Sequence, residues 1–171
     1  MTGENLFFLV TYHLSPVTVL MRLTPEGHAH FERFFRLYLR DERLTLPVVS
    51  IHADQWAHTL TKPFRFGAIT FGRHVFVATS LVARDGDEQM RVPGWLVAHE
   101  MMHVIQYERA GMTRFLFAYL REYARALRRG RRLNAAGHWL AYRAIAQEAE
   151  AYRAEAAYRQ WAERAEILIL R

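Results

Sequence analysis

Residues 93–109 combine a long apolar run with polar side chains set inside it, and this stretch restricts the possible folds more than any other. The stretch reads PGWLVAHEMMHVIQYER, and its polar members within the run are His99, Glu100, His103 and Gln106. A proline at the start and Gly111 just beyond the end predict a helix over about 93–109. Most faces of that helix are apolar, so we expect it to be buried and each polar side chain to need a partner.

The spacing of two histidines in this helix indicates a metal site. Residues four apart lie one above the other on the same helix face, so His99 and His103 direct their imidazoles towards one point. Glu100 lies about a third of a turn away, where it reaches a water at the metal without being a ligand. This H-E-x-x-H pattern supplies two zinc ligands and a general base. The alternative is two separate core histidines, each with its own hydrogen bond.

A zinc site needs at least one further protein ligand, and the candidates near the end of the chain are Glu148, Glu150 and Glu155. The pattern predicts one long helix from Trp139 to about Glu166. Glu148 falls within an apolar stripe of that helix, where an ionised carboxylate is costly unless it is paired or bound to a metal. Glu150 falls on the polar stripe and is expected to be solvated or paired with arginine. Glu155 either supports a ligand or marks the exposed end of the stripe, so Glu148 is the predicted third ligand.

Length and composition limit the class of protein. A chain of 171 residues, 51% of them hydrophobic and 13% aromatic, is expected to form one domain over residues 1–171 with a sizeable core. The sequence contains no cysteine, which excludes disulfides, thiolate metal sites and cysteine nucleophiles. Residues 6–21 are apolar, but the stretch is interrupted by polar residues and is shorter than a spanning helix. No basic residues precede it, so the default expectation is a soluble, cytoplasmic protein without a signal peptide or transmembrane helix.

The remaining patterns predict an α+β fold, in which a small sheet or hairpin from the first half packs against the histidine helix and two further C-terminal helices. Residues 6–12 read as a strand or a buried helical turn, and residues 47–52 read as a strand. Thr24 is a predicted N-cap for a helix carrying an apolar stripe. Residues 68–71 and 74–78 flank Gly72 and Arg73, which is a two-residue hairpin signal. After Gly111, Thr113 is the predicted cap of another helix that ends at Gly130.

The sequence resembles the gluzincin type of HExxH zinc metallopeptidase. The resemblance is carried by His99-Glu100-Met101-Met102-His103 and by Glu148-Ala149-Glu150-Ala151, which look like the H-E-x-x-H and E-x-E-A motifs of that group, over about residues 47–157. Small bacterial peptidases with H-E-x-x-H-x-x-Q are the nearest likeness, and membrane endopeptidases that process prenylated proteins are a more distant one. The resemblance implies zinc held by His99, His103 and Glu148. The sequence departs from that of the membrane enzymes at Tyr152, a position at which they have aspartate.

These observations lead us to expect a zinc-dependent metalloendopeptidase with Glu100 as the general base and a peptide or protein as substrate. The candidates for stabilising the oxyanion of the transition state are Tyr142, Tyr152 and His138. No transmembrane segment or prenyl-protein substrate is expected.

The alternative is a catalytically inactive protein of the same fold. Its working surface is then the Arg-rich loop Arg128–Arg132, in contact with nucleic acid or an acidic partner. The net charge of +6, with 22 arginines and the single lysine Lys62, is compatible with such a partner. Cations at the C-terminus of a helix also suit the helix dipole, so the peptidase remains the favoured function.

Overall fold

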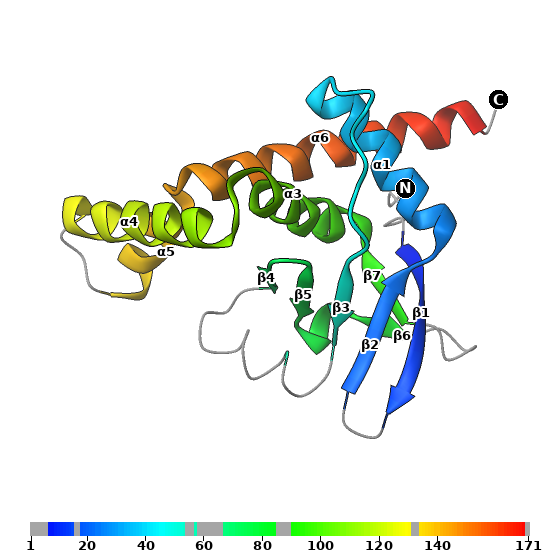
Figure 1. The fold of residues 1–171 in the computed structure, drawn as a ribbon, viewed down its shortest axis with the longest axis horizontal. Helices are drawn as coiled ribbons and strands as arrows, with labels where there is room; N and C mark the ends of the chain where they lie inside the picture. The colour runs from blue at the N-terminus through cyan, green and yellow to red at the C-terminus, as the bar shows by residue number, and fades with distance from the viewer. Residues whose placement is uncertain are drawn as a thin grey trace.

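The computed structural model describes residues 7–15, 18–53, 57, 67–84, 90–130 and 134–169. Within these residues the fold is α+β, as predicted: one mixed sheet lies beneath a layer of helices (Figure 1). Five α-helices are described, and three of them follow the histidine helix where the sequence predicted two.

The sheet has seven strands in the order β4-β5-β3-β2-β1-β7-β6. The strands are β1 (Phe7–Ser15), β2 (Thr18–Leu23), β3 (Ser50–His52), β4 (Ala68–Phe71), β5 (His74–Val77), β6 (Ala83–Arg84) and β7 (Met90–Pro93). Strands β3 and β5 pair in parallel, and every other described pair is antiparallel. Strand β4 therefore forms one edge of the sheet.

Two sequence signals for strands are confirmed with changed boundaries. Of the stretch at residues 6–12, the described residues 7–12 belong to strand β1 and not to a helical turn, and the strand expected at 47–52 is limited to β3. The predicted hairpin is formed by β4 and β5, with Phe71 opposite His74. Gly72 has a φ of +61° in this turn, a conformation that favours glycine because it has no side chain.

The described α-helices are α1 (Pro25–Leu39), α3 (Gly94–Ala110), α4 (Met112–Gly130), α5 (Ala135–Arg143) and α6 (Ala146–Ile169). Helix α3 lies between the sheet and α6, while α4 and α5 extend together to one side (Figure 1). This position explains why α3 is buried at every residue from Leu96 to Tyr107. The expected helix at 93–109 is thus confirmed to within one residue at each end.

Helix α1 is tied to α6 by aromatic packing. Thr24 caps α1 as predicted, since its hydroxyl accepts the Gly27 amide at 3.1 Å. Phe31 and Phe35 are fully buried, and the Phe31 ring stacks on Tyr158 of α6 at a centroid distance of 5.2 Å. These contacts hold α6 against the domain core, so the glutamates of α6 are brought over α3.

The predicted single helix from Trp139 to Glu166 is wrong, because the chain bends at Ala144 and Ile145 to give α5 and α6. Helix α5 packs on α4, whereas α6 packs on α3, and Ile145 is fully buried at the bend. The Glu122 carboxylate of α4 accepts the Ala146 amide at 2.8 Å and so caps the start of α6. A partner so distant in the chain leaves no local signal.

Thr113 is not the cap of α4, because that helix begins one residue earlier at Met112. Among the described helices none combines the length and the apolar character needed to cross a bilayer.

Candidate metal centre

The structure brings His99 and His103 of α3 together with Glu148 of α6. One donor atom from each residue lies within 4.8 Å of the other two. The Nε2 of His99 is 3.5 Å from Glu148 Oε2, and the Nε2 of His103 is 3.4 Å from Glu148 Oε1. Two donors at about 2.1 Å from a tetrahedral metal are about 3.4 Å apart, so the separations suit a bound metal ion. All three side chains are buried, with at most 6% of each residue exposed.

The second nitrogen of each imidazole has a partner that determines its protonation. Gln106 donates its amide nitrogen to the Gln147 carbonyl at 3.1 Å and to Glu150 at 2.9 Å. Its amide oxygen is therefore free to accept, and the Nδ1 of His103 donates to it at 2.9 Å. The Nδ1 of His99 donates in the same way to Glu155 Oε2 at 3.2 Å. In the neutral imidazoles both Nε2 atoms then carry a lone pair directed at Glu148.

This arrangement requires a positive charge at its centre. Two nitrogen lone pairs and a carboxylate repel one another unless protons or a metal cation lie between them. Glu148 Oε2 is fully buried and has no hydrogen-bond partner among the described residues. A buried carboxylate oxygen without a partner is costly, and a metal ion would remove that cost. The residues present therefore fit a metal site.

In the metal-free protein, protons on the two imidazoles supply the positive charge at the centre of the cluster. Burial lowers the pKa of His99, but its interactions with Glu148 and Glu155 outweigh burial and raise that pKa to about 10. The pKa of His103 is also raised, because the effect of Glu148 exceeds that of burial. Burial raises the pKa of the Glu148 carboxyl, but the two imidazoles hold it well below its usual range. The metal-free centre is thus a buried ion pair.

Glu100 lies on α3 beside this cluster and is held by the neighbouring strand. The Thr70 hydroxyl of β4 donates to Glu100 Oε2 at 2.6 Å, and the Tyr107 hydroxyl donates to the Thr70 carbonyl at 3.4 Å. Burial and the Glu100 charge together raise the pKa of Tyr107 to about 12. The predicted general base is therefore oriented by the edge strand of the sheet, and it makes no hydrogen bond to His99 or His103.

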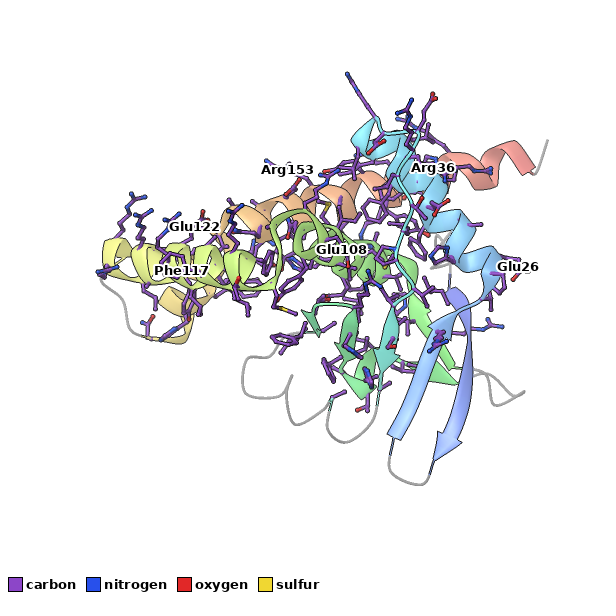
Figure 2. The ribbon with its side chains drawn as sticks, in the orientation of Figure 1. Glu26, Arg36, Glu108, Phe117, Glu122 and Arg153 are labelled. Atoms are coloured by element: carbon purple, nitrogen blue, oxygen red, sulfur yellow. The ribbon has the colours of Figure 1, made fainter. Side chains whose placement is uncertain are left out.

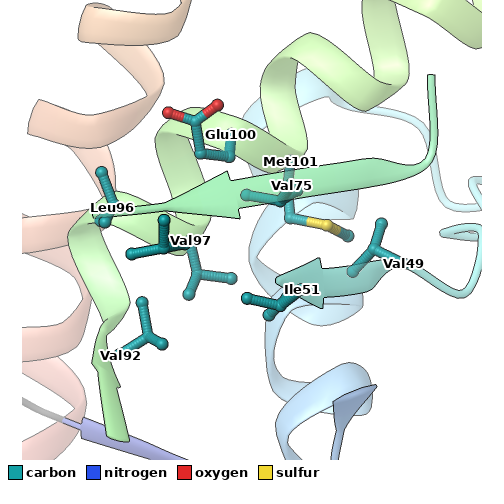
Figure 3. Close-up of a pocket in the computed structure, with 9 residues that line it drawn as sticks. Val49, Ile51, Val75, Val92, Leu96, Val97, Glu100 and Met101 are labelled. Carbon is teal, nitrogen blue, oxygen red and sulfur yellow. The ribbon is translucent and has the colours of Figure 1, made fainter. Parts of the chain in front are cut away.

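A small cavity of about 10 Å³ lies beneath Glu100, between α3 and the sheet. Its walls are apolar and include Ile51, Val75 and Val97. The carboxylate of Glu100 is turned away from these side chains (Figure 3). The cavity holds at most one water and has no polar lining to retain it, so it is a packing defect of the core and no binding site.

Two tyrosines support the third predicted ligand. The Tyr119 hydroxyl of α4 donates to Glu148 Oε1 at 2.9 Å. Tyr142 of α5 also makes a hydrogen bond to Glu148. Burial and the Glu148 charge raise the pKa of both phenols, so both hydroxyls keep their protons and act as donors. Helices α4 and α5 therefore complete the surroundings of a site that α3 and α6 form.

The other two residues predicted to stabilise the oxyanion, Tyr152 and His138, lie at different distances from the cluster. The Tyr152 ring meets His99 edge-on, with centroids 4.7 Å apart, and the Arg143 guanidinium lies 3.9 Å from the Tyr152 ring centre. His138 is exposed near the start of α5, and its Nδ1 accepts from the Tyr123 hydroxyl at 2.6 Å. Within the described structure His138 makes no contact with the cluster.

Several residues of the site were missed or misplaced by sequence reasoning. Glu150 was expected to be solvated or paired with arginine, but it accepts the Gln106 amide next to the cluster. Tyr119 and Thr70 gave no signal, because each contacts an acidic residue 29 or 30 positions away. Gln106 stands three residues after His103, as in H-E-x-x-H-x-x-Q, and that spacing was its only signal. Glu155 was expected either to support a ligand or to mark the exposed end of the stripe, and its carboxylate accepts from the Nδ1 of His99.

Comparison with known proteins gave one match. No curated protein and no solved structure matches the chain. The model of one protein family matches residues 28–111, a range that contains His99, Glu100 and His103 and ends before α4. The third member of the cluster, Glu148, lies outside the matched range. The family to which residues 28–111 are similar is the eCIS core domain, where eCIS denotes the extracellular contractile injection system.

Proposed function

We propose that the chain is a zinc-dependent peptidase, with His99, His103 and Glu148 as the metal ligands. The observation that carries the proposal is the state of the two imidazoles: each Nδ1 donates to a fixed acceptor, so each Nε2 lone pair faces the buried Glu148 carboxylate. Two histidines and one glutamate are a donor set found at catalytic zinc sites, where a fourth position stays open. Zinc is favoured over magnesium or calcium because imidazole nitrogen suits it better.

Glu100 supplies the acid–base chemistry in this proposal. Zinc is a Lewis acid that makes water nucleophilic near neutral pH. The Glu100 carboxylate takes the proton of the attacking water and then delivers it to the amine that leaves. Thr70 donates to Oε2 of Glu100, which leaves Oε1 to accept that proton. Tyr142 and Tyr152 lie at the cluster and remain the candidates for stabilising the oxyanion, whereas His138 pairs with Tyr123 instead.

The position of β4 supports a peptide as the substrate. Strand β4 forms the edge of the sheet, and its residue Thr70 is hydrogen-bonded to Glu100. An extended peptide that adds to this edge through main-chain hydrogen bonds passes next to the proposed general base. Such pairing positions any sequence of side chains, because it uses only the peptide backbone.

Metal analysis and peptide cleavage together test the proposal. The purified chain is expected to contain one zinc ion, and a peptide library digested with it is expected to give metal-dependent products. Glu100→Gln should retain zinc and lose cleavage, because it keeps the shape of the side chain without its basicity. Glu148→Ala should lose zinc, with Glu163→Ala, an exposed change on the same helix, as the matched control.

Each outcome has a clear meaning. Unchanged cleavage by Glu100→Gln would show that another group is the base. Unchanged zinc content in Glu148→Ala would refute the ligand assignment. A stoichiometric zinc ion with no cleavage of any library member would identify a structural metal site and would refute the peptidase.

A further inference from the structure

The net positive charge of this protein is confined to one part of the chain. Residues 111–147 contain eight arginines and a single glutamate, a net charge of +7, while the whole chain carries +6. The other 134 residues therefore sum to −1. A general excess of arginine would spread over the whole surface. The charge is instead concentrated in the segment that forms α4 and α5, which extend to one side of the sheet (Figure 1).

Helix α4 carries five of these arginines on one exposed face, which we call the arginine face. Its members are Arg114, Arg121, Arg125, Arg128 and Arg129, and all are exposed. Their spacing places them within about 100° of the helix circumference. The opposite face of α4 is turned to the domain, where Phe115 is buried and Tyr119 reaches Glu148. Arg131 and Arg132 of the predicted loop lie outside the described residues.

The arginine face is not neutralised by the protein itself. None of its five guanidinium groups forms an ion pair with a carboxylate in the described part of the chain. Glu122, the acidic residue on α4, is engaged with the Ala146 amide. Side chains ending in nitrogen crowd along the outer part of α4, near the labelled Phe117 and Glu122 (Figure 2). Five like charges so close together repel one another, and a bound polyanion would relieve that repulsion.

Aromatic and apolar side chains lie beside this face. Phe117 is 68% exposed and Leu120 is 62% exposed, one turn apart on α4. The Arg121 guanidinium lies 5.8 Å from the centre of the Phe117 ring. An exposed ring next to a guanidinium is a surface on which an unpaired nucleobase can stack.

We propose that the arginine face of α4 binds nucleic acid through the phosphodiester backbone. From Arg114 to Arg128 the face is about 21 Å long, the length of about six phosphates of one strand. Guanidinium groups form paired hydrogen bonds with phosphate oxygens, which makes arginine well suited to this contact. Stacking on Phe117 adds to the binding of a single strand.

The structure favours nucleic acid over the two other polyanions that such a face could meet. An amphipathic helix that enters a membrane needs a broad free apolar face, but the side of α4 that carries the buried Phe115 and the partly buried Leu116, Tyr119, Tyr123 and Leu127 is turned to the domain. The large apolar side chains that α4 leaves exposed are Met112, Phe117 and Leu120, and they offer too little apolar area for insertion. An acidic protein partner would satisfy the charges but gives no role to the exposed ring beside Arg121.

Binding is measured on the full chain with fluorescent DNA of about 20 nucleotides, as a single strand and as a duplex, over a series of salt concentrations. The test variant is Arg121→Gln/Arg125→Gln/Arg128→Gln. The matched control is Arg33→Gln/Arg43→Gln/Arg164→Gln, which removes the same charge from three exposed sites elsewhere. We expect the test variant to lose at least about tenfold in affinity and the slope of log affinity against log salt to fall by about 2 to 3, while the control loses much less.

Two further variants separate base stacking from phosphate binding, and DNA binding from the proposed peptidase activity. Phe117→Ala should weaken single-strand binding about fivefold or more and leave duplex binding nearly unchanged. Glu100→Gln should bind DNA as the unaltered protein does, so a failure of the proposed peptidase leaves this result intact. Equal losses in the test and control variants would refute the arginine face as the binding surface. Equal or stronger binding to phosphatidylserine vesicles or to polyglutamate than to DNA would refute nucleic acid as its partner.

Discussion

The Nδ1 of His99 lies 3.2 Å from Oε2 of Glu155, a residue two helical turns beyond Glu148 on α6. Arg159 holds the other oxygen of the same carboxylate at 3.0 Å. One helix therefore provides both a predicted metal ligand and the group that orients another ligand. Through this pairing the rotation of α6 about its axis determines where the Nε2 of His99 points.

Removal of the Glu155 carboxylate should weaken metal binding. Glu155→Ala leaves the Nδ1 of His99 without its acceptor, and changes at such supporting groups typically cost about 10- to 100-fold in metal affinity. Glu155→Gln keeps an acceptor oxygen for His99 and should lose less zinc affinity than Glu155→Ala. Zinc affinity measured by chelator competition checks this, with exposed Glu163→Ala as the control. An affinity unchanged in Glu155→Ala would show that the ring of His99 is oriented by packing against Tyr152.

Gln106 should orient the second histidine in the same manner. Gln106→Leu is close in size but can neither accept from His103 nor donate to Glu150 and the Gln147 carbonyl. We expect zinc affinity to fall by about 10- to 100-fold and the metal-free protein to lose stability, because Glu150 is left without this donor. Calorimetric titration and thermal unfolding measure the two effects separately. A stability loss without any change in affinity would limit Gln106 to a structural role.

Tyr119→Phe should destabilise the protein through Glu148. The phenol donates to a buried carboxylate, and hydrogen bonds to charged groups contribute about 1.5–3 kcal/mol. Tyr123→Phe is the matched control on the same helix, because it removes a phenol whose partner, His138, is exposed. Denaturant unfolding of both variants gives the comparison. Equal losses of unfolding free energy in the two variants would show that the buried hydrogen bond to Glu148 contributes no more to stability than the exposed one to His138.

The metal-free protein should be most stable in mildly acidic solution. His99 has a folded pKa of about 10 against an ordinary value of 6.5, so its stabilising contribution is complete below pH 6.5 and is lost as the pH rises towards 10. The Glu148 pKa is depressed from 4.5, so its contribution is complete above pH 4.5 and is lost in acid. Stability should therefore be highest between about pH 4.5 and 6.5 in the presence of a chelator.

Bound zinc should abolish the loss of stability between pH 6.5 and 10, because the metal ion replaces the imidazole protons as the central positive charge. Thermal unfolding across pH, with and without zinc, checks both statements. A chelated protein whose stability is unchanged between pH 6.5 and 10 would contradict the buried ion pair.

Thr70→Val should lower kcat with little change in KM. Valine has the same shape as threonine and leaves β4 intact, but it cannot donate to Glu100 Oε2. Loss of orientation of a general base affects the chemical step more than binding. Thr70→Ser restores the hydroxyl and should restore kcat. Steady-state kinetics on a peptide selected from the library give both constants, and a rise in KM alone would assign Thr70 to substrate binding.

Local periodicity in the amino-acid sequence was enough to predict the buried helix, the third ligand candidate and the hairpin. The apolar run around His99 and His103 requires a buried helix, and a spacing of four residues places both imidazoles on one face of it. Glu148 could be selected over Glu150 because an apolar stripe shows burial, and burial of a carboxylate demands a partner. Gly72 identified the hairpin since its turn needs a positive φ.

The groups that complete the site could be found only from contacts between segments far apart in the chain. Thr70, Tyr119 and Tyr142 come from a strand and two helices whose contacts with Glu100 and Glu148 leave no trace in local periodicity. The break between α5 and α6 depends on the distant cap from Glu122, so a continuous helix was predicted where two exist. The contact of Glu150 with Gln106 was missed because it, too, joins residues far apart in the chain. A helical wheel tells which side chains are buried, but the docking of one helix on another decides which of them meet.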